Sequence, residues 1–460
     1  MKALKLQILL FALSLILCNT QLFSQSTEEF KHRRQEVISK LEPNSVLILR
    51  SGNVSGTFAF PRIGGFFYYL TGINETNASL VLRGEHTRPL PPARFGVKPQ
   101  APPSEVLFVT PHNPVTADWD AQGFGIEGAK EELGFMHVKP SGEFDDYLGE
   151  ILLSSPEVLY FDYDKSKYLD SPLTEDEQRI NKAREKGAVL DIQSPALVIA
   201  PFLRTKSPAE IDILQTSVNI ASEAHRTAMK SIQPGMYEYQ LQAIIRYVYS
   251  INGAPAAGFP CIIGSGPNSV ILHWMENSRK MEDGDIVVVD IGADYQFYWS
   301  DITRTIPVNG KYSPRQKEIY EIVLNANEEA IKMVKPGVPF SEVSKKADEV
   351  LAEGMLKIGL IDDKKDFKKY YFHGLGHHIG LINARGVELG TLEAGMVITI
   401  EPGIYIREEE LGVRIEDDVL VTDTGHRVLS ASVPKKVDEI EKLMSEKGID
   451  ISDHLIRQTQ

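Results

Sequence analysis

Two short stretches of sequence decide the fold of the second half of the chain, Asp285-Ile-Val-Val-Val-Asp-Ile-Gly292 and Tyr298-Trp-Ser-Asp-Ile-Thr-Arg-Thr305. The apolar run in the first stretch is typical of a buried strand, and it ends in the carboxylate of Asp290. A turn through residues 293–296 would return the chain and bring Asp301 beside Asp290. We therefore expect two aspartates at the same end of a pair of strands.

The same design returns downstream with glutamates. Met396-Val-Ile-Thr-Ile-Glu401 and Val413-Arg-Ile-Glu416 are apolar runs that end in a carboxylate, and His373-Gly-Leu-Gly-His377 precedes them. Taken singly, these features have simpler interpretations. An aspartate before glycine is more often a turn residue, a lone glutamate in a strand usually faces solvent, and His377 alone is equally well explained as a packed core histidine. We interpret Asp417 and Asp418 as solvent-facing or structural.

Together, the four carboxylates and the imidazole indicate a metal centre. Four carboxylates in one cleft would repel each other and lose solvation, and they would take up protons unless cations compensated them. Two divalent cations would balance the four negative charges. Carboxylate-rich ligation with one imidazole suits Mn(II), with Co(II), Zn(II) or Fe(II) as alternatives. Two metals that share bridging carboxylates would lower the pKa of a bridging water and yield hydroxide at neutral pH.

A repeated pattern of helix signals surrounds these stretches. Ser207-Pro-Ala-Glu210 and Ser313-Pro-Arg-Gln316 each combine an N-cap serine, a first-turn proline and a glutamate or glutamine three residues after the cap. Each is followed by a helical pattern up to a Pro-Gly pair, and then by a second helical pattern over residues 237–251 or 341–358. Two such helix-helix-strand units predict an internal pseudo-twofold axis with a site between the halves.

The first half of the chain predicts a separate α/β domain. Six prolines between residues 86 and 104 mark a surface insertion between two of its strands. The chain has 460 residues and a net charge of −14, which suits a multidomain globular protein and argues against binding to nucleic acids. The patterns predict a helix over residues 30–41 and strands over residues 46–49, 78–82, 106–110 and 158–161.

The order of the candidate ligands resembles the five-ligand signature of the dinuclear metallopeptidases with the pita-bread fold. This family includes methionine aminopeptidase, prolidase and aminopeptidase P. The similarity to aminopeptidase P covers most of residues 28–430 and includes its first domain, which points away from methionine aminopeptidase. The similar segments are Arg33-Arg34-Gln35, Phe66–Gly72, Ile263–Gly266, Ile271–His273, Ser300–Thr305, Glu401–Tyr405 and Arg414–Asp418.

This resemblance implies the domain organisation and the partners. It implies an α/β fold in which an aminopeptidase P-like domain at residues 25–200 precedes a pita-bread catalytic domain at residues 201–430 and a tail at residues 431–460. It also implies homodimers or homotetramers, in which a partner's N-terminal domain closes the cleft. Trp119 is a candidate contributor to that closure, although a surface or local core position explains it equally well.

The resemblance also assigns metal ligands to this sequence. It implies that Asp290 binds one of two metal ions and that Asp301 and Glu416 bridge both ions. His377 and Glu401 would complete the site.

For catalysis, the resemblance implies release of an N-terminal residue from a peptide whose second residue is proline, by attack of a metal-bridging hydroxide. Glu401 would be the base that manages the proton of this hydroxide. His273 would steady the oxyanion beside the scissile carbonyl. His373 and Arg414 would line the proline pocket with Tyr405 beside them, and we count His373 with Glu401 and His273 as catalytic.

One position departs from the family pattern. A further catalytic histidine is expected seven residues after the metal-binding one, where this sequence has Ala384. Loss of one oxyanion donor costs about 10²–10³ in rate, and His378, Asn383 and Arg385 are the nearby candidates to replace it. The alternatives are therefore prolidase, which acts on dipeptides, and a weakly active or inactive peptide-binding relative. A metal-free creatinase-like hydrolase is disfavoured because all five ligands are present.

The first 24 residues predict an export signal rather than part of the fold. Lys2 and Lys5 precede an apolar run over residues 8–17, which is shorter than the roughly 20 residues that span a bilayer. Cleavage near Ser24 would give a periplasmic or secreted protein without a transmembrane segment. Alternatives are a buried helix or a lipoprotein anchored at Cys18, although the bulky residue before Cys18 disfavours the latter. Cleavage would leave Cys261 without a partner for an internal disulfide.

Overall fold

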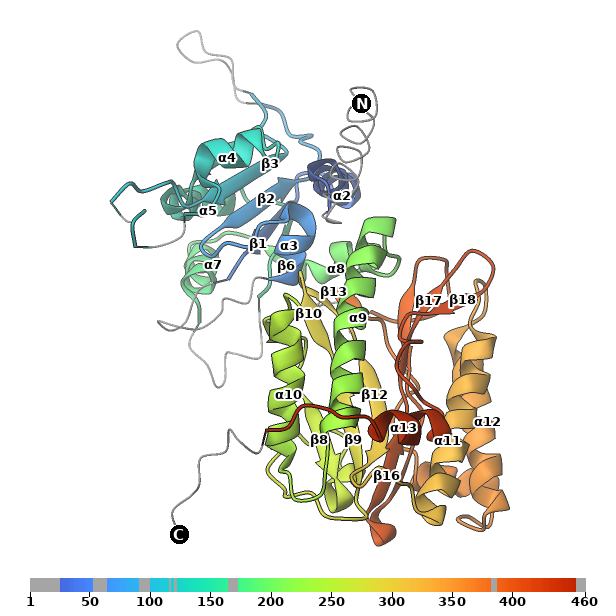
Figure 1. The fold of residues 1–460 in the computed structure, drawn as a ribbon. Helices are drawn as coiled ribbons and strands as arrows, with labels where there is room; N and C mark the ends of the chain where they lie inside the picture. Colours follow the sequence, from blue (N-terminus) through green and yellow to red (C-terminus); the bar gives the residue numbers. More distant parts are fainter. Residues whose placement is uncertain are drawn as a thin grey trace, which may run out of the picture. The chain divides into compact units, whose positions relative to one another are not determined.

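The computed structural model describes residues 25–52, 64–90, 100–115, 117–119, 122–163, 173–381 and 387–451. They form two units, residues 25–202 and the chain from Leu203 onward (Figure 1). The expected export signal with Cys18 lies outside the described residues. Within the described ranges, no helix has both the length and the apolar character that a bilayer crossing requires. Cys261 is buried as a free thiol.

The first unit is built around a six-stranded mixed sheet in the order β4-β3-β2-β1-β5-β6. Its strands are β1 (Val46–Arg50), β2 (Ser79–Arg83), β3 (Glu105–Val109), β4 (Val138–Pro140), β5 (Val158–Tyr160) and β6 (Asp191–Gln193). Its helices are α2 (Thr27–Lys40), α3 (Gly65–Thr71), α4 (Gly125–Glu131), α5 (Phe144–Leu153), α7 (Glu175–Glu185) and α8 (Ala196–Ile199), with 3-10 turns η1 (Ser141–Glu143) and η2 (Ala200–Leu203). The proline-rich insertion connects β2 to β3, as expected.

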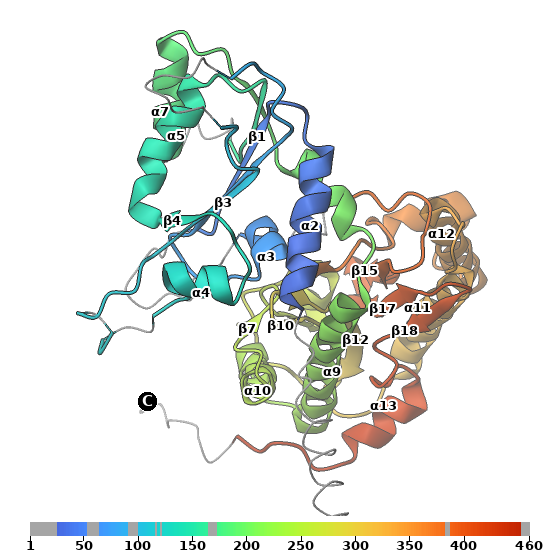
Figure 2. The same cartoon turned by 90° about the horizontal axis from the view of Figure 1, so that it is seen from above.

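Helices cover both faces of this sheet. Figure 2 shows α5 and α7 on one side and α2 with α3 on the other. Successive strand residues face opposite sides, so Val46 and Ile48 pack with the apolar side chains of α5 and α7. The α/β pattern therefore reflects two apolar layers around one sheet, which is the architecture that the sequence predicts.

The Arg33-Arg34 pair holds this unit together rather than serving a site. Arg34 is fully buried, and its Nε donates to Glu105 Oε2 at 2.8 Å while its Nη1 donates to the carbonyl oxygen of Leu70 at 3.0 Å. The guanidinium of Arg33 lies 4.3 Å from the ring centre of Tyr69. These contacts join α2 to α3 and to β3.

The second unit contains two helix pairs, each followed by strands. Its helices are α9 (Pro208–Ser231), α10 (Glu238–Ile251), α11 (Pro314–Met333), α12 (Phe340–Lys357) and α13 (Val437–Met444), with 3-10 turns η3 (Gly266–Val270), η4 (Lys364–Lys369) and η6 (Arg407–Glu409). Its strands are β7 (Ala256–Ala257), β8 (Ile262–Ser265), β9 (Ile286–Ile291), β10 (Ala293–Tyr295), β11 (Tyr298–Trp299), β12 (Ile302–Pro307), β13 (Gly380–Leu381), β14 (Val397–Ile400), β15 (Gly403–Ile406), β16 (Leu411–Arg414), β17 (Asp417–Val421) and β18 (His426–Val428).

The capping signals start both long helices, as the sequence predicts. Ser207 Oγ accepts from Glu210 N at 3.2 Å, and Glu210 Oε2 accepts from Ser207 N at 3.0 Å. Ser313 and Gln316 form the same reciprocal pair ahead of α11. In Figure 1, α9 runs beside α10, and α11 runs beside α12. Because α9 packs on β10, β11 and β12 while α11 packs on β14, β15 and β16, the two halves repeat one arrangement.

The strands form small sheets that bring distant segments together. Their orders are β13-β11-β10-β7, β12-β9-β8, β14-β17-β18 and β15-β16. The return from β9 to β12 is longer than the simple turn that the sequence suggests, because it includes the β10–β11 hairpin. Gln296 and Phe297 form the tip of this hairpin with φ values of 51° and 68°. Left-handed residues at a two-residue turn match the twist of the flanking strands.

The segment after residue 430, expected to be a tail, contains α13. The buried residues Val437, Ile440 and Leu443 of this helix form an apolar stripe, and α13 packs against α9. This part of the segment therefore belongs to the packed second unit.

Candidate metal centre

Strand geometry gathers the five candidate ligands. β9 and β12 are antiparallel, and their register places Asp290 and Asp301 at the same end of the pair, as predicted. Glu401 directly follows β14, and Glu416 separates β16 from β17. Carboxylates at strand ends can converge without breaking the ladders that hold the strands. One cleft of about 430 Å³ is lined by all five residues, Asp290, Asp301, His377, Glu401 and Glu416.

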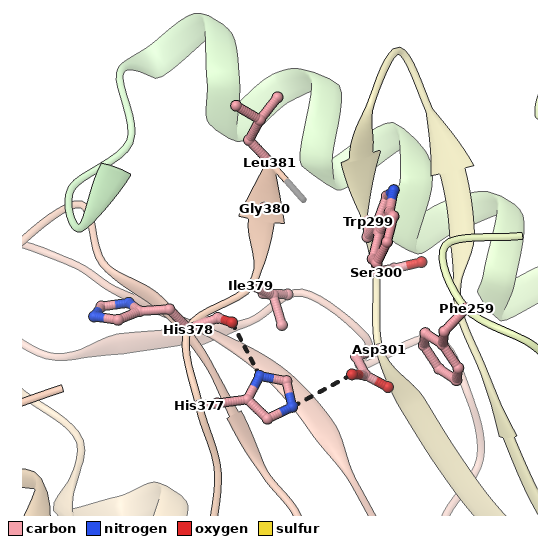
Figure 3. Close-up of a pocket in the computed structure, with 9 residues that line it drawn as sticks. All are labelled: Phe259, Trp299, Ser300, Asp301, His377, His378, Ile379, Gly380 and Leu381. Atoms are coloured by element: carbon pink, nitrogen blue, oxygen red, sulfur yellow. Dashed lines mark hydrogen bonds and ion pairs between the residues drawn. The ribbon is translucent and has the colours of Figure 1, made fainter. Parts of the chain in front are cut away.

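Three of these residues are close enough to share one cation. One ligand atom each from Asp301, His377 and Glu416 lies within 4.8 Å of the others. His377 Nε2 is 3.5 Å from Asp301 Oδ2 and 3.6 Å from Glu401 Oε1. On the other side of the ring, His377 Nδ1 lies 2.9 Å from the carbonyl oxygen of His378 (Figure 3). That carbonyl can only accept, so Nδ1 carries the proton and Nε2 presents its lone pair toward Asp301.

Asp290 and Glu416 are each oriented by one hydrogen bond. Asp290 Oδ2 accepts from Arg414 Nη2 at 2.8 Å, whereas Asp290 Oδ1 is buried without a hydrogen-bond partner among the described residues. Glu416 Oε2 accepts from Thr303 Oγ1 at 2.7 Å. A buried carboxylate oxygen that lacks a donor is costly, and a cation would satisfy it.

The electrostatics of the cleft also fit bound cations. Burial raises the pKa of Glu416 well above its ordinary value, and the nearby charges of Asp301, Glu401 and Asp290 raise it further. Without compensation this carboxylate would hold a proton. Divalent cations would remove that repulsion, and carboxylates with one imidazole are donors that such ions accept. The residues present therefore fit a divalent metal centre.

Two threonines brace the ligands, and sequence analysis did not single them out. Thr399 Oγ1 accepts from His377 N at 3.0 Å and lies 3.2 Å from Glu401 Oε1, to which it donates. Thr303 likewise donates from its hydroxyl to Glu416 Oε2. Thr399 precedes Glu401 by two positions, as Thr303 follows Asp301 by two, so the period of a strand places each on the ligand face. That periodicity was the signal that could have identified them.

A chain of hydrogen bonds forms one wall of the cleft. Arg414 Nη1 donates to the hydroxyl oxygen of Tyr405 at 3.0 Å, and this hydroxyl lies 2.9 Å from His373 Nε2. His373 Nδ1 lies 2.8 Å from the carbonyl oxygen of Gly374 and must donate to it, so Tyr405 donates to Nε2. Burial lowers the pKa of His373 to about 4, so the ring is neutral at neutral pH. His373 therefore presents its ring to the cleft, with both nitrogens bonded to the protein.

His273 lines the cleft and is exposed. The loop that carries it is held in place by a buried carboxylate. The neighbouring Trp274 donates from Nε1 to Glu238 Oε2 at 2.8 Å. Glu238 is fully buried at the start of α10, and it also accepts from the backbone nitrogens of Ser265 and Arg279. The loop that carries His273 is thus tied to one glutamate, whose role sequence analysis missed because it looked like an ordinary first-turn residue.

Asp417 and Asp418 are fully buried and structural rather than solvent-facing. Asp418 Oδ2 accepts from the backbone nitrogen of Asp301 at 3.1 Å, and burial raises the pKa of Asp418 well above its ordinary value. Burial would raise the pKa of Asp417 too, but Arg304 and Lys435 hold it below its ordinary value. Both aspartates therefore support the ligand-bearing strands from behind.

Of the three candidates to replace a histidine at Ala384, the structure describes only His378. Ala384, Asn383 and Arg385 lie outside the described residues. His378 is described, and Figure 3 shows its ring turned away from Asp301 while its carbonyl faces His377. Burial lowers the pKa of His378 to about 3, so its ring is neutral.

Known proteins match both units. A family model described as "Metallopeptidase family M24" matches residues 212–423, and one described as "Aminopeptidase P, N-terminal domain" matches residues 30–160. A Xaa-Pro aminopeptidase of Haemophilus influenzae is 33% identical and covers 91% of this chain and 97% of its own length. A solved structure of zinc-substituted Escherichia coli aminopeptidase P with product has a TM-score of 0.79 at 31% identity, covering 92% of this chain and 98% of its own. A Xaa-Pro dipeptidase of Rattus norvegicus is 35% identical but covers only 52% of this chain and 60% of its own length.

Proposed function

The chain belongs to the Xaa-Pro aminopeptidase family of M24 metallopeptidases and is a metallo-aminopeptidase. From this premise, we propose that it uses two divalent metal ions to release the first residue of peptides whose second residue is proline. One observation carries the proposal. The cleft that gathers the five candidate ligands also contains His273, His373 and Arg414. Groups suited to cation binding, oxyanion stabilisation and proline binding thus face the same volume.

In the proposed reaction, each side chain has a defined task. Divalent cations bound here would neutralise the carboxylates, polarise the scissile carbonyl and supply a water that ionises near neutral pH. Glu401 would take the proton from that water and pass it to the leaving proline nitrogen. His273 would donate a hydrogen bond to the carbonyl oxygen as it becomes tetrahedral. The free amine of the substrate would approach this cluster of metal ions and carboxylates.

The proline pocket would use the wall built by Arg414, Tyr405 and His373. The polar atoms of these three side chains are hydrogen-bonded to one another and to neighbouring protein atoms. Leu272 and Met275 also line the cleft and add apolar surface. A rigid wall with satisfied polar groups favours a compact apolar ring over a flexible polar side chain.

A comparison of three peptides tests this proposal. The purified protein with Mn(II) is incubated with Arg-Pro-Pro, Gly-Pro and Arg-Ala-Ala, and released residues are measured by mass spectrometry. We expect release of arginine from Arg-Pro-Pro only. Release from Arg-Ala-Ala at a similar rate would show that proline at the second position is not required. No turnover by protein with two tightly bound metals would favour an inactive peptide-binding relative.

Prolidase activity is a second candidate, favoured by the 35% identity between about half of this chain and a Xaa-Pro dipeptidase. The Gly-Pro arm of the same assay addresses it, since turnover of Gly-Pro alone would replace our proposal with a dipeptidase. The extent of the match supports the aminopeptidase, because the aminopeptidase relative matches nearly the whole chain while the dipeptidase relative matches about half.

We further propose that the bound metals are Mn(II), that the protein is exported, and that it forms homodimers or homotetramers. Carboxylate-rich ligation supports Mn(II), and metal analysis of protein purified without added metal tests it. Lys2, Lys5 and the apolar run after them support export, which N-terminal sequencing of the mature protein tests. The 86% exposure of Trp119 suits a residue covered by a partner, and light scattering gives the oligomeric state.

A further inference from the structure

A charged network lies behind the cleft, on the side of the ligand strands that faces away from it. Arg304 and Asp417 are both fully buried, and Arg304 Nη2 donates to Asp417 Oδ1 at 2.7 Å. Arg304 Nη1 donates to the carbonyl oxygen of Glu416 at 2.6 Å. Arg304 from β12 therefore binds both the backbone of Glu416 and the side chain of the residue that follows it.

Lys435 adds a second cation from the segment between β18 and α13. Its Nζ donates to Asp417 Oδ2 at 2.8 Å and to Asn327 Oδ1 at 2.8 Å. The side chain of Lys435 is 21% exposed, so it reaches the buried network from the surface. The two oxygens of Asp417 are each paired with a different cation.

Asn327 extends the network to both glutamate ligands. It is fully buried on α11, and its Nδ2 donates to the carbonyl oxygen of Ile400 at 2.9 Å and lies 3.4 Å from that of Ile415. These carbonyls belong to the residues immediately before Glu401 and Glu416. One amide group thus contacts both ligand-bearing strands.

Lys435 determines which way this amide faces. An ammonium can only donate, so it fixes the oxygen of Asn327 toward itself and the NH₂ group toward the two carbonyls. Without the ammonium, Asn327 Oδ1 and Asp417 Oδ2 would both lose a donor in a buried setting. Asn327 contacts the backbone before each glutamate, and Asp417 directly follows Glu416 in the chain.

We propose that Lys435 is a positioning residue for the metal centre, acting on Glu401 and Glu416 through Asn327 and Asp417. The inference rests on the proposed function only in that both glutamates bind metal. Substitution of a group that orients a metal ligand from behind commonly weakens metal binding by about 10–100-fold.

A merely structural role would be to anchor the segment that carries Lys435, but other contacts already do so. Tyr320 donates its hydroxyl to the carbonyl oxygen of Lys435 at 2.8 Å, and Arg304 Nε donates to that of Pro434 at 3.0 Å. Both contacts involve the backbone of the segment. Shortening or neutralising the Lys435 side chain should therefore leave the segment in place.

The test compares Lys435→Met and Lys435→Arg with the matched control Lys436→Met, an exposed lysine at the next position. Each purified full-length protein is stripped of metal with chelator and titrated with Mn(II) in a calorimeter, and the melting temperature of the metal-free form is recorded. We expect Lys435→Met to weaken Mn(II) binding 10–100-fold. Lys435→Arg should restore the affinity to within about threefold, since a guanidinium can reach both acceptors.

A second variant keeps the outcome decisive if Lys435→Met folds poorly. Asn327→Leu breaks the same link from α11, and the double variant should bind Mn(II) no more weakly than the weaker single variant. Mn(II) affinity within about twofold of wild type in Lys435→Met, with a lower melting temperature of the metal-free form, would overturn the proposal. Because no peptide is used, normal metal binding without peptide cleavage would refute only the proposed function, whereas a wild-type protein that binds no divalent metal would refute both.

Discussion

Arg414 Nη2 lies 2.8 Å from Asp290 Oδ2, and the two side chains are only 4% and 11% exposed. The guanidinium also donates to Tyr405, so one cation joins a candidate metal ligand to the wall of the proposed proline pocket. Arg414 compensates the negative charge of Asp290 whether or not a metal is bound. Its loss should therefore matter most in the metal-free protein.

The first prediction is that Arg414→Met destabilises the metal-free protein more than the Mn(II)-bound protein. Removal of one partner from a buried ion pair costs about 3–5 kcal/mol. Bound Mn(II) would replace part of the lost positive charge beside Asp290, so the difference from wild type should shrink. Urea unfolding in chelator and in excess Mn(II) measures both values, with the exposed Arg407→Met as control. Equal losses under the two conditions would contradict the assignment of Asp290 as a ligand.

The second prediction concerns Glu401. Glu401→Gln keeps the size of the side chain but cannot take up a proton, so we expect kcat for Arg-Pro-Pro to fall by about 10²–10⁴. Glu401→Ala also removes a candidate ligand and should abolish measurable activity. The control is Glu393→Gln, which changes a glutamate that is 57% exposed and paired with Arg204 at the surface. Retained activity in Glu401→Ala would show that the site is misplaced.

Local signals made much of the fold predictable. The capping pairs at Ser207 and Ser313 act within a single helical turn, and the apolar run before Asp290 identifies its own strand. The four candidate carboxylate ligands could be named because they lie at the ends of apolar strands, and His377 because it lies in the His-Gly-Leu-Gly-His segment between those strands. Such features need no information about distant residues.

The supporting contacts could not be predicted because they join residues far apart in the chain. Lys435 reaches Asn327 over 108 positions and Asp417 over 18, and nothing in the composition of a charged C-terminal segment indicates which lysine is partly buried. The β10–β11 hairpin was missed because its tip residues Gln296 and Phe297 are not the glycines that usually mark a left-handed turn.

The third prediction is a pH effect from His225 on α9. This side chain is buried and donates from Nε2 to the carbonyl oxygen of Ile302 at 2.9 Å. Burial, followed by the charge of Arg304, lowers its pKa from 6.5 to about 3, although Asp417 opposes this shift. Between these values the unfolded chain holds a proton that the folded protein does not. Stability is therefore lost as the pH falls from about 6.5 toward 3, by about 1.4 kcal/mol per pH unit where the difference is one full proton.

His225→Gln tests this directly, because glutamine can still donate to Ile302 and does not titrate. Urea unfolding of the metal-free protein at several values between pH 4 and 6 should give a shallower pH dependence for the variant, by about one proton. An identical pH dependence of the free energy of unfolding in the two proteins would mean that the pKa of His225 is the same in the folded and unfolded states.

The last prediction separates the placement of His273 from metal binding. Glu238 is fully buried and accepts from Ser265 N and Oγ, Asn268 Nδ2, Trp274 Nε1 and Arg279 N at 2.6–3.2 Å. Glu238→Gln would turn an NH₂ group toward donors, so we expect a loss of about 1–3 kcal/mol in the free energy of unfolding. The loop with His273 should shift, and a misplacement of about 1 Å can lower kcat/KM by about 10². Calorimetric titration should give Mn(II) affinity within about twofold of wild type, because none of the five candidate ligands lies on this loop. The exposed Glu223→Gln on α9 is the control, and a parallel fall in metal affinity would show that Glu238 supports the whole catalytic unit rather than the His273 loop.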